Sequence, residues 1–395
     1  MRRLNMTAIA FGIVLSIGVW GPPASADVDL KERYMKTGGD TRGIDVRKFH
    51  VFLADGSKGL KIINLSNPNR AMLTGFLSIP DSFVEQVAVD KNMAVLTDTR
   101  NRQIHFVNTR NVYRPELQAS LRVEGDIPRR VIASGGKAYV VEYGDDPTSL
   151  RYFSGIEVFS YTSGAEPESS QLKAIENVRD VVFHRGYVFV AAGHQIMAYK
   201  PSASGLSDEP IKTLMLSARE QIQSVTAFNG YLFVFGSNEL YVVGFVPIPL
   251  RIPGSMPGSP LDIPSKDRRL PKLELKVITQ IPVDCESERR RINATIADYG
   301  GGLTSEPNIV ILLTTLNTYG LFVFNQSERK IRAFTIHDLS ASDTYVFRNV
   351  NEATEGRLRI FDAIFPEHTY PGWLKGGVIG IGALGENGFG WVHIL

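Results

Sequence analysis

The sequence predicts an all-β fold, a seven-bladed β-propeller closed by an N-terminal strand that completes the last blade. Three observations predict it. Long helical periodicity is nearly absent, and short β-branched and aromatic runs recur between clusters of Gly, Pro, Asn and Asp. One six-residue strand of alternating hydrophobicity also appears in seven copies along the 395 residues. A repeat every forty to sixty residues or so is typical of sheets arranged radially around an axis.

The six-residue strand is the clearest element of the repeat. It usually opens with Gly or a polar residue, and its copies are 59–64, 103–108, 155–160, 195–200, 239–244, 320–325 and 390–395. Another strand lies upstream of each copy, at 50–54, 93–97, 137–141, 187–191, 231–235, 308–313 and 378–383. Each unit therefore contains at least one β-hairpin.

In the first five units a further strand precedes this hairpin at a constant offset. The apolar residue that marks it stands seven residues before a matching residue of the next strand, and the five are Ile44, Val87, Val131, Val181 and Val225. A fourth strand follows in the first six units, at 71–79, 116–123, 171–175, 211–216, 273–281 and 331–336. Four strands per unit make one blade.

The last unit has no fourth strand of its own, because the sequence stops at Leu395. Residues 30–35 are expected to supply it by pairing onto the last blade, which would remove two exposed sheet edges. A set of separate β-sandwiches is the alternative. In either case, 43% hydrophobic and 21% charged residues are enough for a packed core and exclude a disordered or collagen-like chain.

The first 26 residues have the features of a secretory signal peptide. Arg2 and Arg3 precede an apolar stretch, and Ala24-Ser25-Ala26 is a small-residue cleavage site. The strongest apolar run, 8–20, is shorter than the roughly 20 residues that a bilayer requires. We therefore expect an exported protein, periplasmic or extracellular, whose residues 27–395 form a single domain with no transmembrane span.

The charge of the chain limits the classes of partner that it can bind, and its cysteine content limits its disulfides. The formal charge is +2, and without Arg2 and Arg3 the chain would carry 41 basic and 41 acidic residues. A neutral chain lacks the basic field of nonspecific nucleic-acid binding, so no nucleic-acid partner is expected. Cys285 is the only cysteine, which excludes an intramolecular disulfide and leaves a lone thiol that is either packed or reactive.

The first unit carries a resemblance to a known family. Val51-Phe52-Leu53-Ala54-Asp55, then 59–64 (GLKIIN) and Ser66-Asn67-Pro68 resemble the strand, strand and turn of the LVIVD repeat of secreted bacterial β-propellers. Asn64 stands where that family usually has Asp, and the later units keep mainly the alternation. The resemblance implies a secreted propeller and no single activity.

In a propeller the innermost strands line a central channel, so the residues just before them are expected at the channel mouth. These two positions are Arg42-Gly43, Glu85-Gln86, Arg129-Arg130, Arg179-Asp180, Gln223-Ser224, Arg290-Arg291 and Leu358-Arg359. Seven arginines against two acids favour a site for carboxylates or phosphates, because guanidinium binds such oxyanions through paired hydrogen bonds. The predicted ligand-binding residues are Arg42, Glu85, Arg129, Arg130, Arg179, Asp180, Arg290, Arg291 and Arg359.

A purely structural role is the alternative to ligand binding for the same arginines. Acids in the loops on that face, Asp55, Asp98, Glu142, Asp145 and Asp146, would neutralise them and form a salt-bridge collar between blades. Three insertions also interrupt the repeat: 144–154, which overhangs the arginine mouth, the proline-rich 246–271, and 365–375 on the far face. The proline-rich segment is expected to pack as a stiff belt or to dock a partner.

The sequence holds no nucleophile elbow, phosphate-binding glycine loop, zinc motif or calcium loop, and we expect no metal and no cofactor. The preferred hypothesis is a non-catalytic binding or scaffold module for a protein or an anionic polysaccharide. One alternative is a hydrolase or lyase acting on a sugar or lactone, with Glu85 or Asp180 as acid/base. Another is a structural component of a cell-surface assembly. The sequence leaves the oligomeric state open.

Overall fold

The computed structural model describes residues 30–67, 69–145, 153–161, 165–217, 221–228, 230–246, 273–283, 290–296, 308–315, 318–325, 329–334, 341–342, 348–349, 362–364, 378–383 and 389–394. Within these ranges the regular structure is entirely β, with no helical segment. The all-β class that the sequence predicts is therefore correct.

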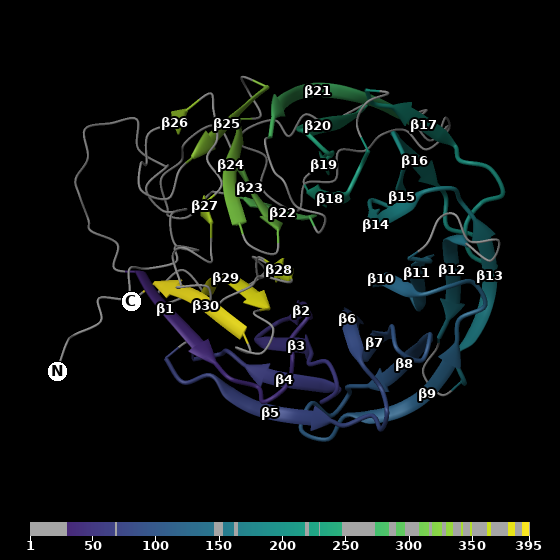
Figure 1. The fold of residues 1–395 in the computed structure, drawn as a ribbon, viewed down its shortest axis with the longest axis vertical. Helices are drawn as coiled ribbons and strands as arrows, with labels where there is room; N and C mark the ends of the chain where they lie inside the picture. The colour runs from purple at the N-terminus through teal and green to yellow at the C-terminus, as the bar shows by residue number, and fades with distance from the viewer. Residues whose placement is uncertain are drawn as a thin grey trace, which may run out of the picture.

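Five consecutive runs of four strands each form an antiparallel sheet, in chain order from the centre outward (Figure 1). Sheet one is β2 (Gly43–Arg47), β3 (His50–Ala54), β4 (Leu60–Asn64) and β5 (Met72–Leu77). Sheet two is β6 (Val84–Asp90), β7 (Met93–Asp98), β8 (Gln103–Asn108) and β9 (Glu116–Arg122). Sheet three is β10 (Pro128–Ser134), β11 (Lys137–Tyr143), β12 (Ser154–Ser160) and β13 (Glu168–Ala174).

Sheets four and five repeat this order. Sheet four is β14 (Val178–His184), β15 (Tyr187–Ala192), β16 (Gln195–Tyr199) and β17 (Lys212–Met215). Sheet five is β18 (Ser224–Phe228), β19 (Tyr231–Phe235), β20 (Glu239–Val246) and β21 (Glu274–Pro282). The strands expected in these five units are all present, with bounds that differ by a few residues at most.

The remaining strands form two further sheets. The first contains β22 (Arg290–Ile296), β23 (Asn308–Thr315), β24 (Thr318–Asn325), β25 (Lys330–Phe334) and the short β26 (Ala341–Ser342), with β27 (Arg348–Asn349) paired to β24. The sequence did not indicate β26 or β27. The second is β28 (Asp362–Ile364), β29 (Val378–Ala383), β30 (Phe389–Ile394) and β1 (Leu30–Met35). Leu30 lies opposite Ile394 and Met35 opposite Phe389, which is the pairing expected of residues 30–35.

The sheets surround a common centre, as Figure 1 shows. Each inner strand contacts the inner strand of the next sheet, in the order β2, β6, β10, β14, β18, β22, β28 and back to β2. The arrangement is propeller-like, and it brings the starts of successive inner strands close together around the axis.

Two-residue turns explain the constant offset in the first five units. Val87 pairs with Leu96 and Val181 with Val190, and the other three marker residues have partners nine residues on in the same way. The loop between β10 and β11 is Gly135-Gly136, with φ of 62° and 79°. Left-handed residues at both loop positions match the twist of a hairpin, which fixes the register of this inner pair.

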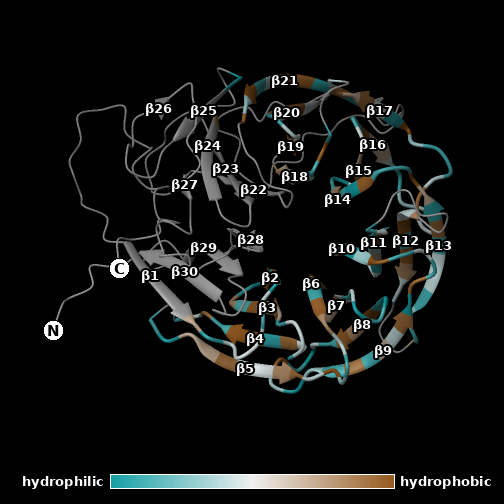
Figure 2. Ribbon diagram, in the orientation of Figure 1, coloured by the Kyte–Doolittle hydropathy of each residue, from teal (hydrophilic) through white to brown (hydrophobic). Residues whose placement is uncertain are grey.

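The core lies between sheets. One cluster joins Phe52 and Ile62 of sheet one to Val87 and Leu96 of sheet two, and equivalent clusters join sheets two and three, three and four, and four and five. The middle strands are consequently buried on both faces; every residue of β7 and of β19 is buried. Figure 2 shows apolar segments in the inner and middle strands of these sheets. Burying a large apolar side chain stabilises the fold by about 1.5–3 kcal/mol, so these sheets hold one another in place.

Candidate functional site

Three predicted site residues occupy one special position, a bulge at the start of an inner strand. The pairing of β6 with β7 skips Glu85, that of β10 with β11 skips Arg129, and that of β14 with β15 skips Arg179. A bulge adds a residue without a partner and turns its side chain away from the regular alternation. The same distortion in three sheets therefore presents Glu85, Arg129 and Arg179 at the same level of the ring.

The residues that follow the bulges form a different structure, a side-chain belt across four sheets. Arg130 Nη1 donates to Gln86 Oε1 at 2.7 Å, and Arg130 Nε lies 3.2 Å from Asp180 Oδ1. Ser224 Oγ and the Val225 N–H donate to Asp180 Oδ2 at 2.6 and 3.0 Å. Gln86, Asp180 and Ser224 are fully buried. The sequence grouped Arg130 and Asp180 with the ligand site, whereas their contacts tie neighbouring sheets together.

Arg42 stands just before β2 and begins the mouth in sheet one. Its backbone N–H donates to Ala54 O at 2.8 Å, and its guanidinium pairs with Asp40. The guanidinium also lies 5.8 Å from the ring centre of Phe83, whose other guanidinium neighbour is Arg100 at 5.6 Å. Phe83 thus orients two arginines from neighbouring sheets.

Tyr143 has the same role one sheet further on. Arg129 lies 5.5 Å and Arg179 4.8 Å from the centre of its ring, so this aromatic residue also has an arginine from its own sheet and one from the next. Arg129 pairs with the exposed Asp145, as the sequence suggested, and makes a cation–π contact as well. Among the described residues Arg179 has no ion pair.

The strength of the Arg129–Asp145 pair decides whether it blocks the mouth. Asp145 is 79% exposed, and such surface pairs contribute only about 0–1 kcal/mol. Arg129 Nε is buried and has no hydrogen-bond acceptor within the described part of the chain. A buried donor is costly to leave unpaired.

Of the other collar acids expected from the sequence, the three that the structure describes do not pair with the mouth arginines. Asp55, Asp98 and Glu142 are fully buried at the ends of their strands and hold groups of their own sheets instead of the mouth arginines. Asp55 accepts hydrogen bonds from the hydroxyls of Thr37 and Thr41. The expectation is wrong for these three acids because groups in the segment that leads into the inner strand already donate hydrogen bonds to their carboxylates. These hydrogen bonds hold the carboxylates inside the sheet.

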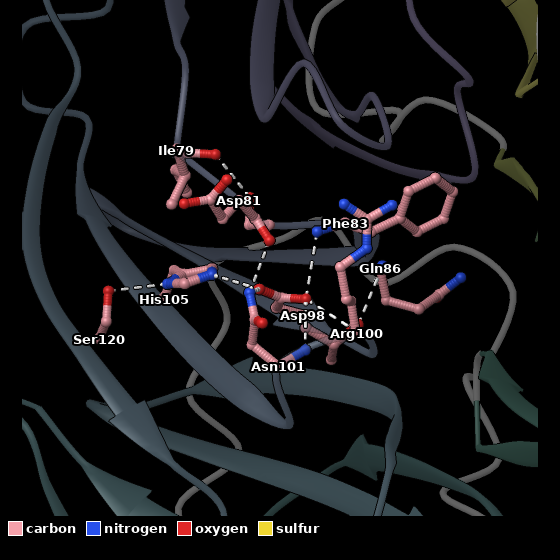
Figure 3. Close-up of polar contacts among 11 residues, drawn as sticks. Ile79, Asp81, Phe83, Gln86, Asp98, Arg100, Asn101, His105 and Ser120 are labelled. Carbon is pink, nitrogen blue, oxygen red and sulfur yellow. Dashed lines mark hydrogen bonds and ion pairs between the residues drawn. The ribbon is translucent and has the colours of Figure 1, made fainter.

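Sheet two contains a Ser–His–Asp constellation that sequence reasoning missed, in which His105 and Asp98 are buried and Ser120 is exposed (Figure 3). Ser120 Oγ lies 2.8 Å from His105 Nδ1, and His105 Nε2 lies 3.3 Å from Asp98 Oδ2. The Phe83 N–H donates to Asp98 Oδ1 at 3.1 Å, and Asn101 also binds Asp98. Burial acts to raise the pKa of Asp98, but these hydrogen bonds outweigh it and lower the pKa. One sequence signal could have revealed this constellation. In several units an acid at the end of one strand is followed by a polar residue at the third position of the six-residue strand that comes next.

Hydrolases use the same three residue types, but this constellation is arranged to join strands. Ser120 lies on the outer strand β9, away from the mouth, whereas His105 and Asp98 are buried between strands. Both imidazole nitrogens and both Asp98 oxygens are already engaged. We therefore assign these residues to holding sheet two together.

Several expectations concern residues whose side chains or backbone lie outside the described ranges. Arg290 and Arg291 begin β22, where only their backbone is described, and Arg291 pairs with Thr314. Arg359, Cys285, the signal peptide, the loop 146–152 and the insertions 247–271 and 365–375 also lie outside. No group of three metal-ligating side chains occurs among the described residues. No helix in them has the length and apolarity needed to cross a membrane.

Comparison with known proteins adds information on the fold only. No protein-family model matches the chain, and no curated protein matches it. A chain in a Saccharomyces cerevisiae structure of Dbp5 bound to Nup159, Gle1, IP6 and ADP is similar over 94% of this chain and 97% of its own, with a TM-score of 0.51 and 9% identity.

A protein from Lactobacillus plantarum matches with a TM-score of 0.49 and 11% identity over 75% of this chain and 80% of its own. A protein of unknown function from Desulfotomaculum acetoxidans matches with a TM-score of 0.48 and 10% identity over 71% and 76%. At these identities the likeness concerns the fold alone.

Proposed function

We propose that this protein is an exported, non-catalytic seven-bladed β-propeller, related to the LVIVD-repeat propellers, that binds an oxyanion-bearing partner at its arginine mouth. The closed succession of inner-strand contacts and the pairing of β1 with β30 support seven blades with the N-terminal strand completing the last. In this arrangement the mouth is the place where several sheets contribute side chains at one level.

The observation that carries the proposal is the pair of arginine–aromatic clusters. Arg42 and Arg100 lie against Phe83, and Arg129 and Arg179 lie against Tyr143. A ring stacked beside a guanidinium restricts the rotation of the guanidinium without occupying the N–H groups at its edge. Arginines held in this way lose little conformational entropy on binding carboxylate, sulfate or phosphate groups.

The contacts of the two acids argue against the sugar- or lactone-cleaving alternative. Asp180 is buried, with three hydrogen bonds and an ion pair, which leaves no oxygen available to exchange a proton with a substrate. Glu85 belongs to another sheet. A matched acid/base pair at a suitable separation is what such chemistry needs, and these two residues do not provide one.

Binding to anionic polymers tests the proposal. The double variant Arg129→Ala/Arg179→Ala should bind polygalacturonate and heparin at least about tenfold more weakly, since each charge-assisted hydrogen bond contributes roughly 1.5–3 kcal/mol. The matched control is Arg110→Ala/Arg114→Ala, which removes two exposed arginines from the β8–β9 connection. Isothermal titration calorimetry with uncharged dextran as a reference gives the affinities. Equal losses in both double variants, or none in the first, would reject an arginine mouth.

A further inference from the structure

Two carboxyl groups lie side by side in the interior of sheet three. Glu142 is on β11 and Glu157 is on β12, the neighbouring strand, and neither residue has any exposed surface. In the pairing of these strands Glu142 lies opposite Gly155 and Glu157 opposite Val140, so the two acids are diagonal neighbours on the same face of the sheet. An ionised carboxylate only accepts hydrogen bonds, so a bond between two carboxyl groups requires a proton on one of them.

Among the described residues, hydrogen-bond donors surround this pair and no cation forms an ion pair with it. The Asp126 N–H donates to Glu142 Oε2 at 3.0 Å, and the Glu124 N–H donates to Glu157 Oε2 at 2.9 Å. Ser169 Oγ donates to Glu157 Oε1. Glu142 Oε1 has no donor among the described residues, which is the state expected of an oxygen that carries a proton itself.

The β9–β10 connection, whose backbone N–H groups contact the pair, itself carries two more acids, Glu124 and Asp126. Arg102 lies 3.3 Å from Asp126 Oδ1. The ring of Phe153 lies near Glu142: a Cβ added at Gly125 would be 2.5 Å from that ring and 2.3 Å from Glu142 Oε2. Two negative charges in this dry position would repel each other strongly.

We propose that Glu142 and Glu157 share one proton at neutral pH, and that its loss in alkaline solution loosens the part of sheet three that carries the mouth. Glu142 directly precedes Tyr143, and Asp126 lies three residues before Arg129, so the pair holds both segments that build the second arginine–aromatic cluster. This inference does not depend on what binds at the mouth.

The titration of Glu142 is consistent with the geometry. Burial first, and then the hydrogen bond to Glu157 and its charge, raise the pKa of Glu142 to about 9, while backbone hydrogen bonds from Asp126 and Gly125 act in the opposite direction. The group thus keeps its proton over the whole neutral range.

Infrared spectroscopy detects the shared proton directly, because a protonated carboxylic acid has a C=O band that carboxylates lack. The wild-type protein should show this band at pH 7 and lose it between about pH 8 and 10. In Glu142→Gln, where a neutral amide keeps the donor to Glu157, the band should be absent at pH 7. In the matched control Glu124→Gln, which alters the exposed neighbour, the band should remain.

Hydrogen exchange tests the loosening. At pH 9.5, peptides covering 124–129 and 139–143 should exchange several-fold faster in the wild type than in Glu142→Gln at the same pH, with no such difference at pH 6. Absence of the acid band from the wild-type protein at pH 7, or its persistence in Glu142→Gln, overturns the shared proton. Equal exchange in the two proteins at pH 9.5 overturns the loosening. If Glu142→Gln does not fold, the wild-type titration alone decides.

Discussion

Asp180 shows how one residue joins three sheets. It belongs to β14, pairs with Arg130 of β10 and accepts from Ser224 and Val225 of β18. Its carboxylate is completely buried, so its oxygens have no water to replace these partners. A single side chain at this position therefore contributes more to the cohesion of the ring than any surface ion pair.

Replacing Asp180 measures that contribution. Asp180→Ala leaves the Arg130 guanidinium and several donors without their acceptor, and breaking a buried pair of this kind costs about 3–5 kcal/mol. Equilibrium urea unfolding should show a loss near the lower figure, because Arg130 keeps 23% of its side chain exposed. Asp208→Ala, at an exposed position, should change the free energy of unfolding by less than about 0.5 kcal/mol. Similar losses in both variants would mean that the belt does not stabilise the ring.

His184 is expected to make the folded protein less stable at acid pH. The Gly230 N–H donates to its Nε2 at 3.2 Å, which joins sheets four and five and requires the neutral ring. Burial first, then the charge of Arg185, lowers the pKa of His184 to about 4, below its usual 6.5. A histidine with a lowered folded-state pKa contributes stability above its unfolded pKa and loses it as the pH falls.

We therefore expect the wild-type melting temperature to fall between pH 6.5 and 4 by more than that of His184→Gln, which cannot titrate. Differential scanning calorimetry across this range gives the comparison. His194→Gln, a change to another histidine of the same sheet, is the matched control and should follow the wild type. Parallel curves for the wild type and His184→Gln would show that His184 does not control acid stability.

At the level of single elements, the hairpin turns fix the register of each sheet. The β14–β15 turn consists of Arg185 and Gly186, with φ of 48° and 80°. A Cβ on Gly186 would have no atom within 4 Å, so a substitution there acts through the backbone alone. Left-handed backbone costs an ordinary residue about 1–2 kcal/mol, and Asn tolerates it better than most.

Gly186→Ala should thus lower the free energy of unfolding by about 1 kcal/mol, and Gly186→Asn by clearly less. Chemical unfolding of both variants is the measurement. A larger loss in the asparagine variant would mean that contacts of the new side chain, and not the left-handed backbone alone, determine the change in stability.

The strands of the first five units and their pairing could be predicted from the sequence because both depend on local patterns. Alternating apolar residues and two-residue turns repeat in each unit, and their spacing gives one register. The bulges at Glu85, Arg129 and Arg179 leave the spacing of apolar residues unchanged, so the sequence did not separate these residues from Gln86, Arg130 and Asp180. Burial of Glu142 could not be anticipated either, since acids at strand ends are usually exposed.

At the level of the whole molecule, sheets two, three and four are each stabilised by packing against two neighbouring sheets and not by a central core. The clusters form an unbroken series from sheet one to sheet five, and the inner strands of successive sheets contact one another from β2 through β28 and back to β2. The arginines of the mouth come from different sheets, so the packing between sheets sets their relative positions. The pairing of β1 with β30 is the step on which closure depends.

Cross-linking of β1 to β30 tests ring closure most directly. In a Cys285→Ser background, Glu32→Cys/Val392→Cys and Arg33→Cys/Trp391→Cys place thiols on residues that face each other in the pairing. One of two successive antiparallel pairs has the closer spacing, about 4.5 Å between Cα atoms, that a disulfide accepts. We predict that at least one pair oxidises readily in the folded protein, whereas the off-register Glu32→Cys/Trp391→Cys stays reduced. If both facing pairs stay reduced, or the off-register pair forms as fast, the ring is not closed in this way.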